Sequence, residues 1–232
     1  MPLPRIGKWF GVELIAVSTT EKLVAAFGGG LAILALTGIS SWALPEAGAA
    51  AIIGSMGASA VLLFAVPHGQ LSQPWPVIAG HAVSAIIGVT CARFIPQPIL
   101  AAACASALAI GAMHQLKCIH PPGGATALTA VIGGSAIHEL GYRFVLFPVL
   151  GNAIVMVLLA VLINSAFKWR RYPAILNRPA PSPVHKSTTE LPPPTHEEVL
   201  AAVRSLDSFV DISEEDLLRL VELLKTHPGQ PR

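Results

Sequence analysis

The sequence predicts an all-α membrane protein, a helical bundle followed by a small soluble α-helical tail. Hydrophobic residues make up 53% of the 232 residues and charged residues only 12%, whereas a soluble globular domain carries about 25% charged residues. The charges are also unevenly placed. Between residues 23 and 167 the acidic and basic residues are Glu46, Arg93, Lys117, Glu139 and Arg143. Polar, charged and proline residues are concentrated after residue 167, which indicates a membrane domain followed by a soluble segment.

Four apolar runs are long enough to cross a bilayer, namely residues 23–44, 77–95, 99–116 and 144–167. At about 1.5 Å per residue the first reaches roughly 33 Å. Two further apolar segments, residues 47–66 and 125–134, are interrupted or short, and each is either a re-entrant element or an imperfect crossing. Both alternatives give an even number of crossings, four or six, which places both termini on one side.

Basic residues flank the predicted membrane domain of residues 23–167. Arg5 and Lys8 lie in the N-terminal segment of residues 1–22, and Lys168 and Arg170 follow the last span. The positive-inside rule therefore predicts that both termini are cytoplasmic. The first 22 residues lack a compact apolar run with a small-residue cleavage site, so we expect no cleaved signal peptide.

Two pairs of similar segments indicate an internal repeat. "GASAVL" at 57–62 matches "GATALT" at 124–129, and "VIAGHAV" at 77–83 echoes "VLGNAIV" at 149–155. The repeats would cover about residues 23–95 and 99–167. Internal repeats with broken helices near the middle of the membrane are typical of transporters.

The chain after the last span divides into two parts. Residues 168–194 are rich in proline and are expected to be a linker. Residues 195–232 contain two short amphipathic patterns, the first with a capping box formed by Thr195 and Glu198. This tail buries little by itself, so it is expected to dock on a neighbouring subunit of a homo-oligomer or on a partner protein. Its acidity excludes nucleic acid as that partner.

The stretch "CIHPPGGATA" at 118–127 is expected to break a helix. Pro121 and Pro122 lack backbone donors and interrupt the helix, and the two glycines that follow permit a turn before a new helix starts. The N-terminus of a helix offers free N–H groups and partial positive charge, which together favour an anion. The candidate substrate-binding residues here are Lys117, His120, Gly123, Gly124 and Thr126.

The first repeat offers a similar helix start without prolines, at Gly57 and Ser59. His81 and Asn152 each follow a glycine inside a span and occupy matching positions in the two repeats. All four are further candidates for substrate binding. Simpler readings remain open: His81 and Asn152 as interhelical hydrogen-bonding residues, Lys117 as a residue that snorkels to the interface, and the prolines and glycines as a plain kink.

The sequence indicates neither a metal site nor a catalytic site. His114 and His120 lie close in sequence, but no carboxylate or thiolate pattern completes a ligand set. No nucleophile, base and orienting group occur together, so an enzyme and a bound cofactor are not expected.

"HPPGGATAL" at 120–128 resembles the signature of the HPP family of integral membrane proteins. The stretch "GASAVLLFAVPHGQLSQPWPVIAGH" at 57–81 is similar to the family's other well-marked segment. The resemblance covers about residues 20–167 and implies a four-spanning bundle. We expect the protein to lie in a bacterial inner membrane. Members from photosynthetic organisms are associated with nitrite transport, whereas most bacterial members have no assigned substrate. The tail resembles the segment that leads into paired CBS domains in longer members, but nucleotide sensing is not carried over.

These observations predict a transporter or channel that lies in the lipid bilayer and moves a small anion, with nitrite as the first candidate. The alternative is a scaffold that transports nothing and whose helical tail recruits a partner.

Overall fold

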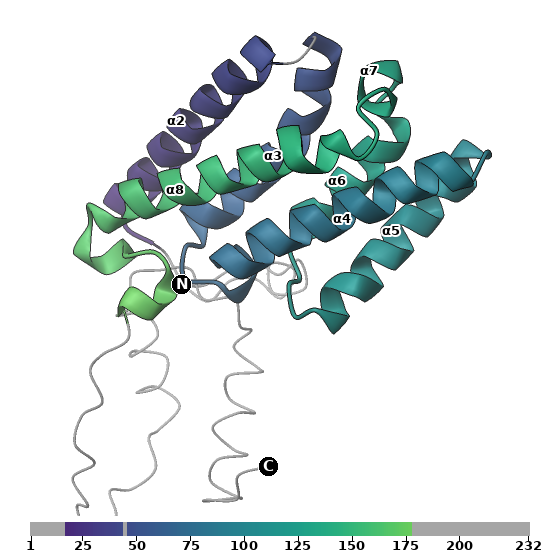
Figure 1. Cartoon of the computed structure of the whole chain (residues 1–232). Coiled ribbons are helices and arrows are strands. Elements are labelled where there is room, and N and C mark those ends of the chain that lie inside the picture. Colours follow the sequence, from purple (N-terminus) through teal and green to yellow (C-terminus); the bar gives the residue numbers. More distant parts are fainter. Residues whose placement is uncertain (1–16, 44–45, 178–232) are drawn as a thin grey trace, which may run out of the picture. The chain divides into compact units, whose positions relative to one another are not determined.

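A computed structural model of the chain describes residues 17–43 and 46–177 (Figure 1). Leu23–Arg178 form one compact unit, and the contacts discussed below lie within it. The described part is all-helical, as predicted. Its α-helices are α2 (Thr19–Ala43), α3 (Glu46–Ala65), α4 (Pro74–Phe94), α5 (Pro98–Gln115), α6 (Pro121–Ile132), α7 (Ser135–His138) and α8 (Gly151–Ser165). The predicted N-terminal segment up to residue 16, the linker from residue 178 and the helical tail lie outside the described residues.

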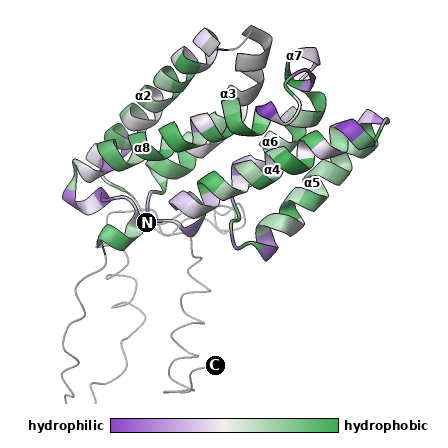
Figure 2. Cartoon of the chain, in the orientation of Figure 1, coloured by the Kyte–Doolittle hydropathy of each residue, from purple (hydrophilic) through white to green (hydrophobic). Residues whose placement is uncertain are grey.

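Four stretches are long and apolar enough to cross a membrane, which confirms the four predicted spans. They are Thr19–Trp42, Pro74–Phe94, Pro98–Gln115 and Val145–Ser165. Large hydrophobic side chains on these helices are exposed, among them Phe27, Trp42, Phe94, Ile99 and Leu162. Figure 2 shows hydrophobic residues along these helices and polar residues mainly in the turns between them. Such apolar surfaces contact the lipid bilayer rather than water.

Prolines set the start of three helices. Pro74, Pro98 and Pro121 each occupy the first helical position, where the missing N–H would have no partner inside the helix and the fixed φ suits the first turn. The Gln97 side chain also caps α5, because it accepts a hydrogen bond from the Leu100 N–H.

The segment 47–66 was predicted to be interrupted, and here the prediction is wrong. Helix α3 runs without a break from Glu46 to Ala65, through Gly54 and Gly57. A glycine inside a helix costs only about 1 kcal/mol relative to alanine, which tertiary packing can offset. At about 1.5 Å per residue, α3 is roughly 30 Å long.

The predicted break at residues 118–127 is present. Helix α5 ends at Gln115, and Lys117 adopts a left-handed conformation (φ 52°) in the turn that follows. His120 is the extended N-cap residue (φ −142°, ψ 101°) from which α6 starts. With twelve residues, α6 is about 18 Å long and shorter than a bilayer core. Whether it is a re-entrant element or part of a crossing stays a prediction.

A second irregularity interrupts the last span and was not predicted. The π-helical segment η2 (Val145–Leu150) precedes α8, and Phe147 within it has an extended conformation (φ −143°, ψ 129°). Pro148 explains the kink, because its ring removes a backbone donor and clashes with the preceding turn.

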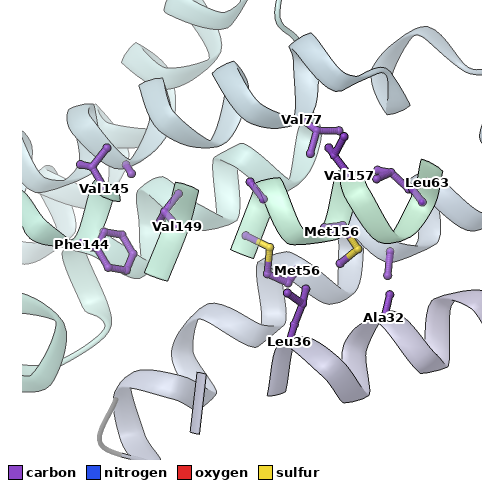
Figure 3. Packing of buried hydrophobic residues seen from close by; sticks show 14 of the residues in the cluster. Ala32, Leu36, Met56, Leu63, Val77, Phe144, Val145, Val149, Met156 and Val157 are labelled. Carbon is purple, nitrogen blue, oxygen red and sulfur yellow. The ribbon is translucent and has the colours of Figure 1, made fainter. Parts of the chain in front are cut away.

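The largest apolar core lies between α2, α3 and α8 and reaches α4. Figure 3 shows Leu36 of α2 and Met56 of α3 close to Met156 of α8, all three fully buried. Val77 of α4 belongs to the same cluster. This core fixes α3 beside α8, and it therefore holds the inner face of α3, which carries Ser59, against the rest of the bundle.

Helices α4 and α6 cross at glycines. A Cβ atom on Gly80 would lie 2.8 Å from the Cβ of His120, and one on Gly88 would lie 2.8 Å from the Cβ of Ala130. On α6, a Cβ on Gly123 would lie 2.8 Å from the Ser84 hydroxyl. Small residues at such a crossing let two backbones approach closely, as is common between membrane helices.

One end of the bundle gathers the turn between α3 and α4, the turn between α5 and α6, and the residues after α8. The Trp75 indole donates to the Leu116 carbonyl (3.2 Å), and the Tyr172 hydroxyl donates to the Ser72 carbonyl (2.8 Å). We call this end the basic end, because it carries Lys117, Lys168, Arg170 and Arg171. The opposite end carries Arg93, Glu139 and Arg143, with the Arg93 guanidinium 5.6 Å from the Tyr142 ring centre.

Part of the first ten residues of the predicted linker packs against the helical bundle. Residues 168–170 and 174–177 form short 3-10 turns. Arg170 and Tyr172 are buried, and the Tyr172 hydroxyl bonds to the turn before α4.

The internal repeat itself stays a prediction, because α3 is continuous over 20 residues and α6 has 12.

A buried histidine–hydroxyl cluster as the candidate functional site

Four buried polar side chains from three helices form one hydrogen-bonded cluster. The Ser59 hydroxyl of α3 lies 2.8 Å from Nε2 of His81 on α4 and 2.9 Å from Nε2 of His120. The Thr126 hydroxyl of α6 lies 2.7 Å from Nδ1 of His81. All four side chains have an exposed fraction of 0%. We call these four residues the His–Ser–His–Thr cluster.

A backbone carbonyl fixes the direction of these hydrogen bonds. Nδ1 of His120 lies 2.8 Å from the Leu71 carbonyl in the turn before α4. A carbonyl oxygen only accepts, so Nδ1 of His120 carries the proton, and in the neutral ring Nε2 is an acceptor. The Ser59 hydroxyl then donates to Nε2 of His120 and accepts from Nε2 of His81. Nδ1 of His81 accepts from the Thr126 hydroxyl, so every neutral group in the cluster is satisfied.

Both hydroxyls have a second acceptor close by. The Ser59 hydroxyl can donate to the Ser55 carbonyl at 3.2 Å, and the Thr126 hydroxyl to the Pro122 carbonyl at 3.3 Å. The Ser59 proton can therefore turn from Nε2 of His120 to a backbone carbonyl, and the Thr126 proton can turn from Nδ1 of His81 in the same way. The cluster accommodates more than one arrangement of its protons for this reason.

The two imidazoles lie close enough to affect each other's charge. Their ring centres are 4.9 Å apart in an edge-to-face arrangement. Two positive charges at that separation repel by about 3 kcal/mol at an effective dielectric constant near 20. The group that bonds to the other side of His120 is the Leu71 carbonyl.

The cluster lies inside the helical bundle rather than at its surface. His81 comes seven residues after Pro74, the first residue of α4, which corresponds to about 10 Å along the helix. Since α4 is one of the candidate spans, the cluster lies roughly a third of the way across a bilayer core of about 30 Å.

Local sequence explains how these residues meet. Pro121 and Pro122 start α6 immediately after His120, so the imidazole projects from the N-cap position. Gly80 leaves room for the His120 Cβ beside α4. Ser59 and Thr126 are the matching positions of the two proposed repeats, and they bond to opposite nitrogens of the same ring, that of His81.

The expectation of free backbone donors at the start of α6 is wrong for its first three positions. Pro121 and Pro122 have no N–H group, and the Gly123 N–H donates to the His120 carbonyl at 2.8 Å. The prolines that start the helix also remove the donors that an anion would need. Side chains of the cluster, rather than backbone N–H groups, are therefore the polar groups available here.

The other predicted residues lie apart from the cluster. Lys117 is exposed at the basic end, and Gly123 is buried at the crossing with α4, whereas a Cβ on Gly124 would meet nothing within 4 Å. Gly57 lines an apolar cavity of about 450 Å³ between α2 and α3. Asn152 is fully buried, and its amide donates to the Ser40 hydroxyl (2.9 Å), which is the interhelical hydrogen bond considered as its simpler role. Its Oδ1 atom has no hydrogen-bond partner among the residues that the structure describes.

Three features of the site region were missed. One is the Leu71 carbonyl, because no side-chain pattern in the sequence indicates a backbone acceptor. The small residues Gly80, Ser84 and Gly88 recur every four positions, a pattern that signals a helix crossing. Arg170 bonds to the Phe64 carbonyl at the end of α3 and to the Asn164 side chain. A buried arginine after an apolar run could not be distinguished from a surface basic flank.

Among the described residues, no group of three or more histidine, cysteine, aspartate or glutamate side chains could hold a metal ion. Cys91 and Cys118 are buried free thiols, and Cys104 is a partly buried one.

Comparison with known proteins places the chain among membrane proteins. A family model described as "HPP, transmembrane region" matches residues 15–173, which include every helix named above. Two transmembrane proteins of Dictyostelium discoideum are each 40% identical to the chain over 126 residues. The aligned region is 53% of this chain and 40% and 44% of the two relatives, so the chain spans less than half of their length. No solved structure matches.

Proposed function

The chain belongs to the HPP family of membrane proteins, and on this premise we propose that it is a transporter or channel for a small anion, with nitrite as the first candidate substrate. The observation that carries the proposal is the sharing of the Ser59 hydroxyl by His81 and His120 inside a bundle of candidate spans. Ionisable residues within membrane spans are costly and usually mark the pathway of an ion or a substrate.

The chemistry of the cluster suits a small anion. Imidazole N–H and hydroxyl groups are hydrogen-bond donors, and nitrite is an acceptor at both oxygens. No carboxylate faces the two rings in the part of the chain that the structure describes, so nothing there repels a negative charge. Asn152 supports a second polar position inside the bundle, because within the described residues its buried Oδ1 atom lacks a partner.

Transport is a better reading of the Ser59–His81 pair than catalysis. A serine beside a histidine also forms the core of many hydrolytic sites. Here the same hydroxyl is shared with a second imidazole, and both rings are fully buried. A nucleophile needs its hydroxyl directed at a substrate, whereas this one is engaged on both sides by histidines.

In this proposal the protein lies in a bacterial plasma membrane with its basic end facing the cytoplasm. Lys117, Lys168, Arg170 and Arg171 lie at that end, against Arg93, Arg143 and Glu139 at the other. An excess of lysine and arginine close to the ends of the spans favours the cytoplasmic side.

The test is an anion panel with the purified full-length chain in vesicles of phosphatidylethanolamine and phosphatidylglycerol. Uptake of nitrite, nitrate and chloride is measured at mildly alkaline pH, where nitrous acid is scarce and protein-free vesicles leak little nitrite. We expect nitrite uptake above that of protein-free vesicles and above uptake of chloride. The Thr126→Val variant keeps the shape of the side chain but loses the hydroxyl, so we expect slower nitrite uptake. Failure to move any of the three anions would contradict the proposal.

A further inference from the structure

We infer that the His81–His120 pair is a single proton-binding site, shared through Ser59, and that the anion crosses together with one proton. This inference rests on the proposed function and deepens it, because it names the coupling ion. It makes transport of a monovalent anion electrically neutral and dependent on a pH gradient.

The first argument is the lack of a permanent positive charge at the cluster. A buried anion is stable only beside a cation or a strong set of donors. In the described part of the chain, the groups that meet the two rings are hydroxyls on α3 and α6, the Leu71 carbonyl of the turn before α4, and the other ring. Lys117 lies three residues before His120 but is exposed at the basic end. A proton on the imidazole pair is therefore the nearest source of positive charge.

The second argument is that the cluster accepts one extra proton without losing a hydrogen bond. The proton binds to the Nδ1 lone pair of His81, and an N–H bond forms there. The Thr126 hydroxyl turns to the Pro122 carbonyl and accepts from the new N–H. Nε2–H of His81 still donates to Ser59, which still donates to His120. Every polar atom of the cluster keeps a partner in this charged state.

The Ser59 hydroxyl also lets the proton move between the rings. Nε2–H of His81 passes its proton to the Ser59 oxygen while the Ser59 proton passes to Nε2 of His120. One N–H and one O–H bond break, and one O–H and one N–H bond form. The positive charge then resides on His120, whose Nδ1–H remains on the Leu71 carbonyl. The reverse transfer returns the charge to His81, and when the Nδ1 proton of His81 then leaves with the anion, the neutral arrangement is restored.

The third argument sets the number of protons at one. The ring centres are 4.9 Å apart, so a second positive charge would be opposed by direct repulsion. No carboxylate of the described residues lies between the rings to reduce it. Among the described residues, the titratable group that faces each imidazole is the other imidazole. His81 comes from α4, and His120 comes from the N-cap of α6. Groups in such a pair titrate together rather than independently.

The flux test separates a proton gradient from a voltage. Vesicles containing the full chain receive nitrite outside, either with an acidic exterior and the membrane potential clamped at zero by potassium and valinomycin, or with equal pH and an imposed potential. Uptake by protein-free vesicles is subtracted. We expect the pH gradient to accelerate uptake and the potential to leave it unchanged. Uptake that follows the potential and ignores the pH gradient would overturn the inference and leave the proposed anion transport intact. No protein-dependent uptake under either condition would overturn both.

Binding gives a second readout that does not depend on flux. Nitrite is titrated into the purified chain by calorimetry in two buffers with different enthalpies of ionisation, which reports the protons taken up per nitrite. We expect uptake of one proton in the wild type and in Ser84→Ala, a buried serine on α4 outside the cluster. In Ser59→Ala the bridge between the rings is lost, and we expect the pH-driven uptake rate to fall by about tenfold or more. Nitrite binding without proton uptake in the wild type, or equal pH-driven rates in the two serine variants, would count against the shared site.

Discussion

The imidazole rings of His81 and His120 lie edge to face with centres 4.9 Å apart, and one hydroxyl, that of Ser59, bonds to the Nε2 atoms of both. Neither ring can gain or lose the proton on its Nε2 atom without changing the donor or acceptor that Ser59 presents to the other. The outer nitrogens differ, because Nδ1 of His81 meets a hydroxyl and Nδ1 of His120 meets a carbonyl. His120 is thus held in one tautomer while neutral, and His81 is the ring that can take up a proton on its outer side.

The two nitrogens of His120 can be tested separately by amide substitutions. His120→Asn places an amide near the position of Nδ1, so it keeps the bond to the Leu71 carbonyl and loses the contact with Ser59. His120→Gln places an amide near the position of Nε2, so it keeps the contact with Ser59 and loses the bond to the Leu71 carbonyl. We expect the asparagine variant to fold and to lose nitrite uptake. We expect the glutamine variant to be less stable by about 1–3 kcal/mol, because the partly buried Leu71 carbonyl loses its donor.

Thermal unfolding in detergent and nitrite uptake in vesicles are measured for both His120 variants and the wild type. The expected pattern is a nearly unchanged melting temperature with lost uptake for His120→Asn. If that variant transports at the wild-type rate, the contact between His120 and Ser59 has no role in transport.

Much of the fold could be predicted from the sequence, because length and hydropathy alone identify a span. The four candidate spans and the break before Pro121 follow from apolar runs and from proline chemistry. The continuity of α3 through Gly54 and Gly57 could not be predicted from the sequence. A glycine only weakens a helix, and packing decides whether the helix persists. The kink at Pro148 had a sequence signal that the apolar run around it obscured.

The crossing of α4 and α6 gives a matched pair of glycine substitutions. Gly123→Ala would place a Cβ 2.8 Å from the Ser84 hydroxyl and 3.0 Å from the Gly80 carbonyl, whereas Gly124→Ala would meet nothing within 4 Å. We expect Gly123→Ala to destabilise the protein by about 1–3 kcal/mol through overpacking. We expect Gly124→Ala to be neutral or stabilising by up to about 1 kcal/mol, because alanine is the better helix former.

Chemical unfolding in mixed micelles compares the two alanine variants with the wild type. Because the crossing also holds His120 beside α4, nitrite uptake should fall in Gly123→Ala and persist in Gly124→Ala. Equal stability of both variants would mean that α6 can shift away from α4 at little cost.

Tyr172 lies after the last span, is fully buried and donates to the Ser72 carbonyl at 2.8 Å. Burial raises the pKa of its hydroxyl above the usual range, because the charged phenolate is poorly solvated. An unfolded chain would ionise its tyrosines near pH 10, so the stabilisation from Tyr172 is full below that pH and is lost as the pH rises beyond it. The Tyr172→Phe variant should be less stable by about 1 kcal/mol at neutral pH.

We expect a steeper alkaline loss of stability in the wild type than in Tyr172→Phe, measured as melting temperature against pH in detergent. Tyr142→Phe is the control, since Tyr142 is exposed and its removal should leave the alkaline loss in place. Parallel pH profiles for the wild type and Tyr172→Phe would show that the phenol contributes nothing to it.

The candidate site was predictable in part, and the reason is geometric. His120, Thr126 and Ser59 are predicted site residues because they lie at two expected helix starts, and His81 because it follows a glycine inside a span. The four prove to be one another's hydrogen-bond partners. Free backbone donors are missing at the first three positions of α6, because Pro121 and Pro122 have no N–H group and Gly123 donates to the N-cap carbonyl. Which polar groups meet depends on how α3, α4 and α6 cross, and no local pattern specifies a crossing between distant segments.

The proposed orientation can be tested with single cysteines at the two ends of α6. Lys117 at the basic end and Glu139 after the far end of α6 are both exposed. Twelve residues of helix separate these ends, a distance of about 18 Å. Cys104, which is partly buried, is replaced by alanine to lower background labelling, while Cys91 and Cys118 are buried and stay.

If lysine and arginine set the orientation, an impermeant maleimide should label Lys117→Cys only from the cytoplasmic side of inside-out vesicles. Glu139→Cys should be labelled only from the opposite side, in intact spheroplasts. Labelling of both positions from the same side would mean that α6 enters and leaves the membrane on one face, and would make it a re-entrant element rather than part of a crossing.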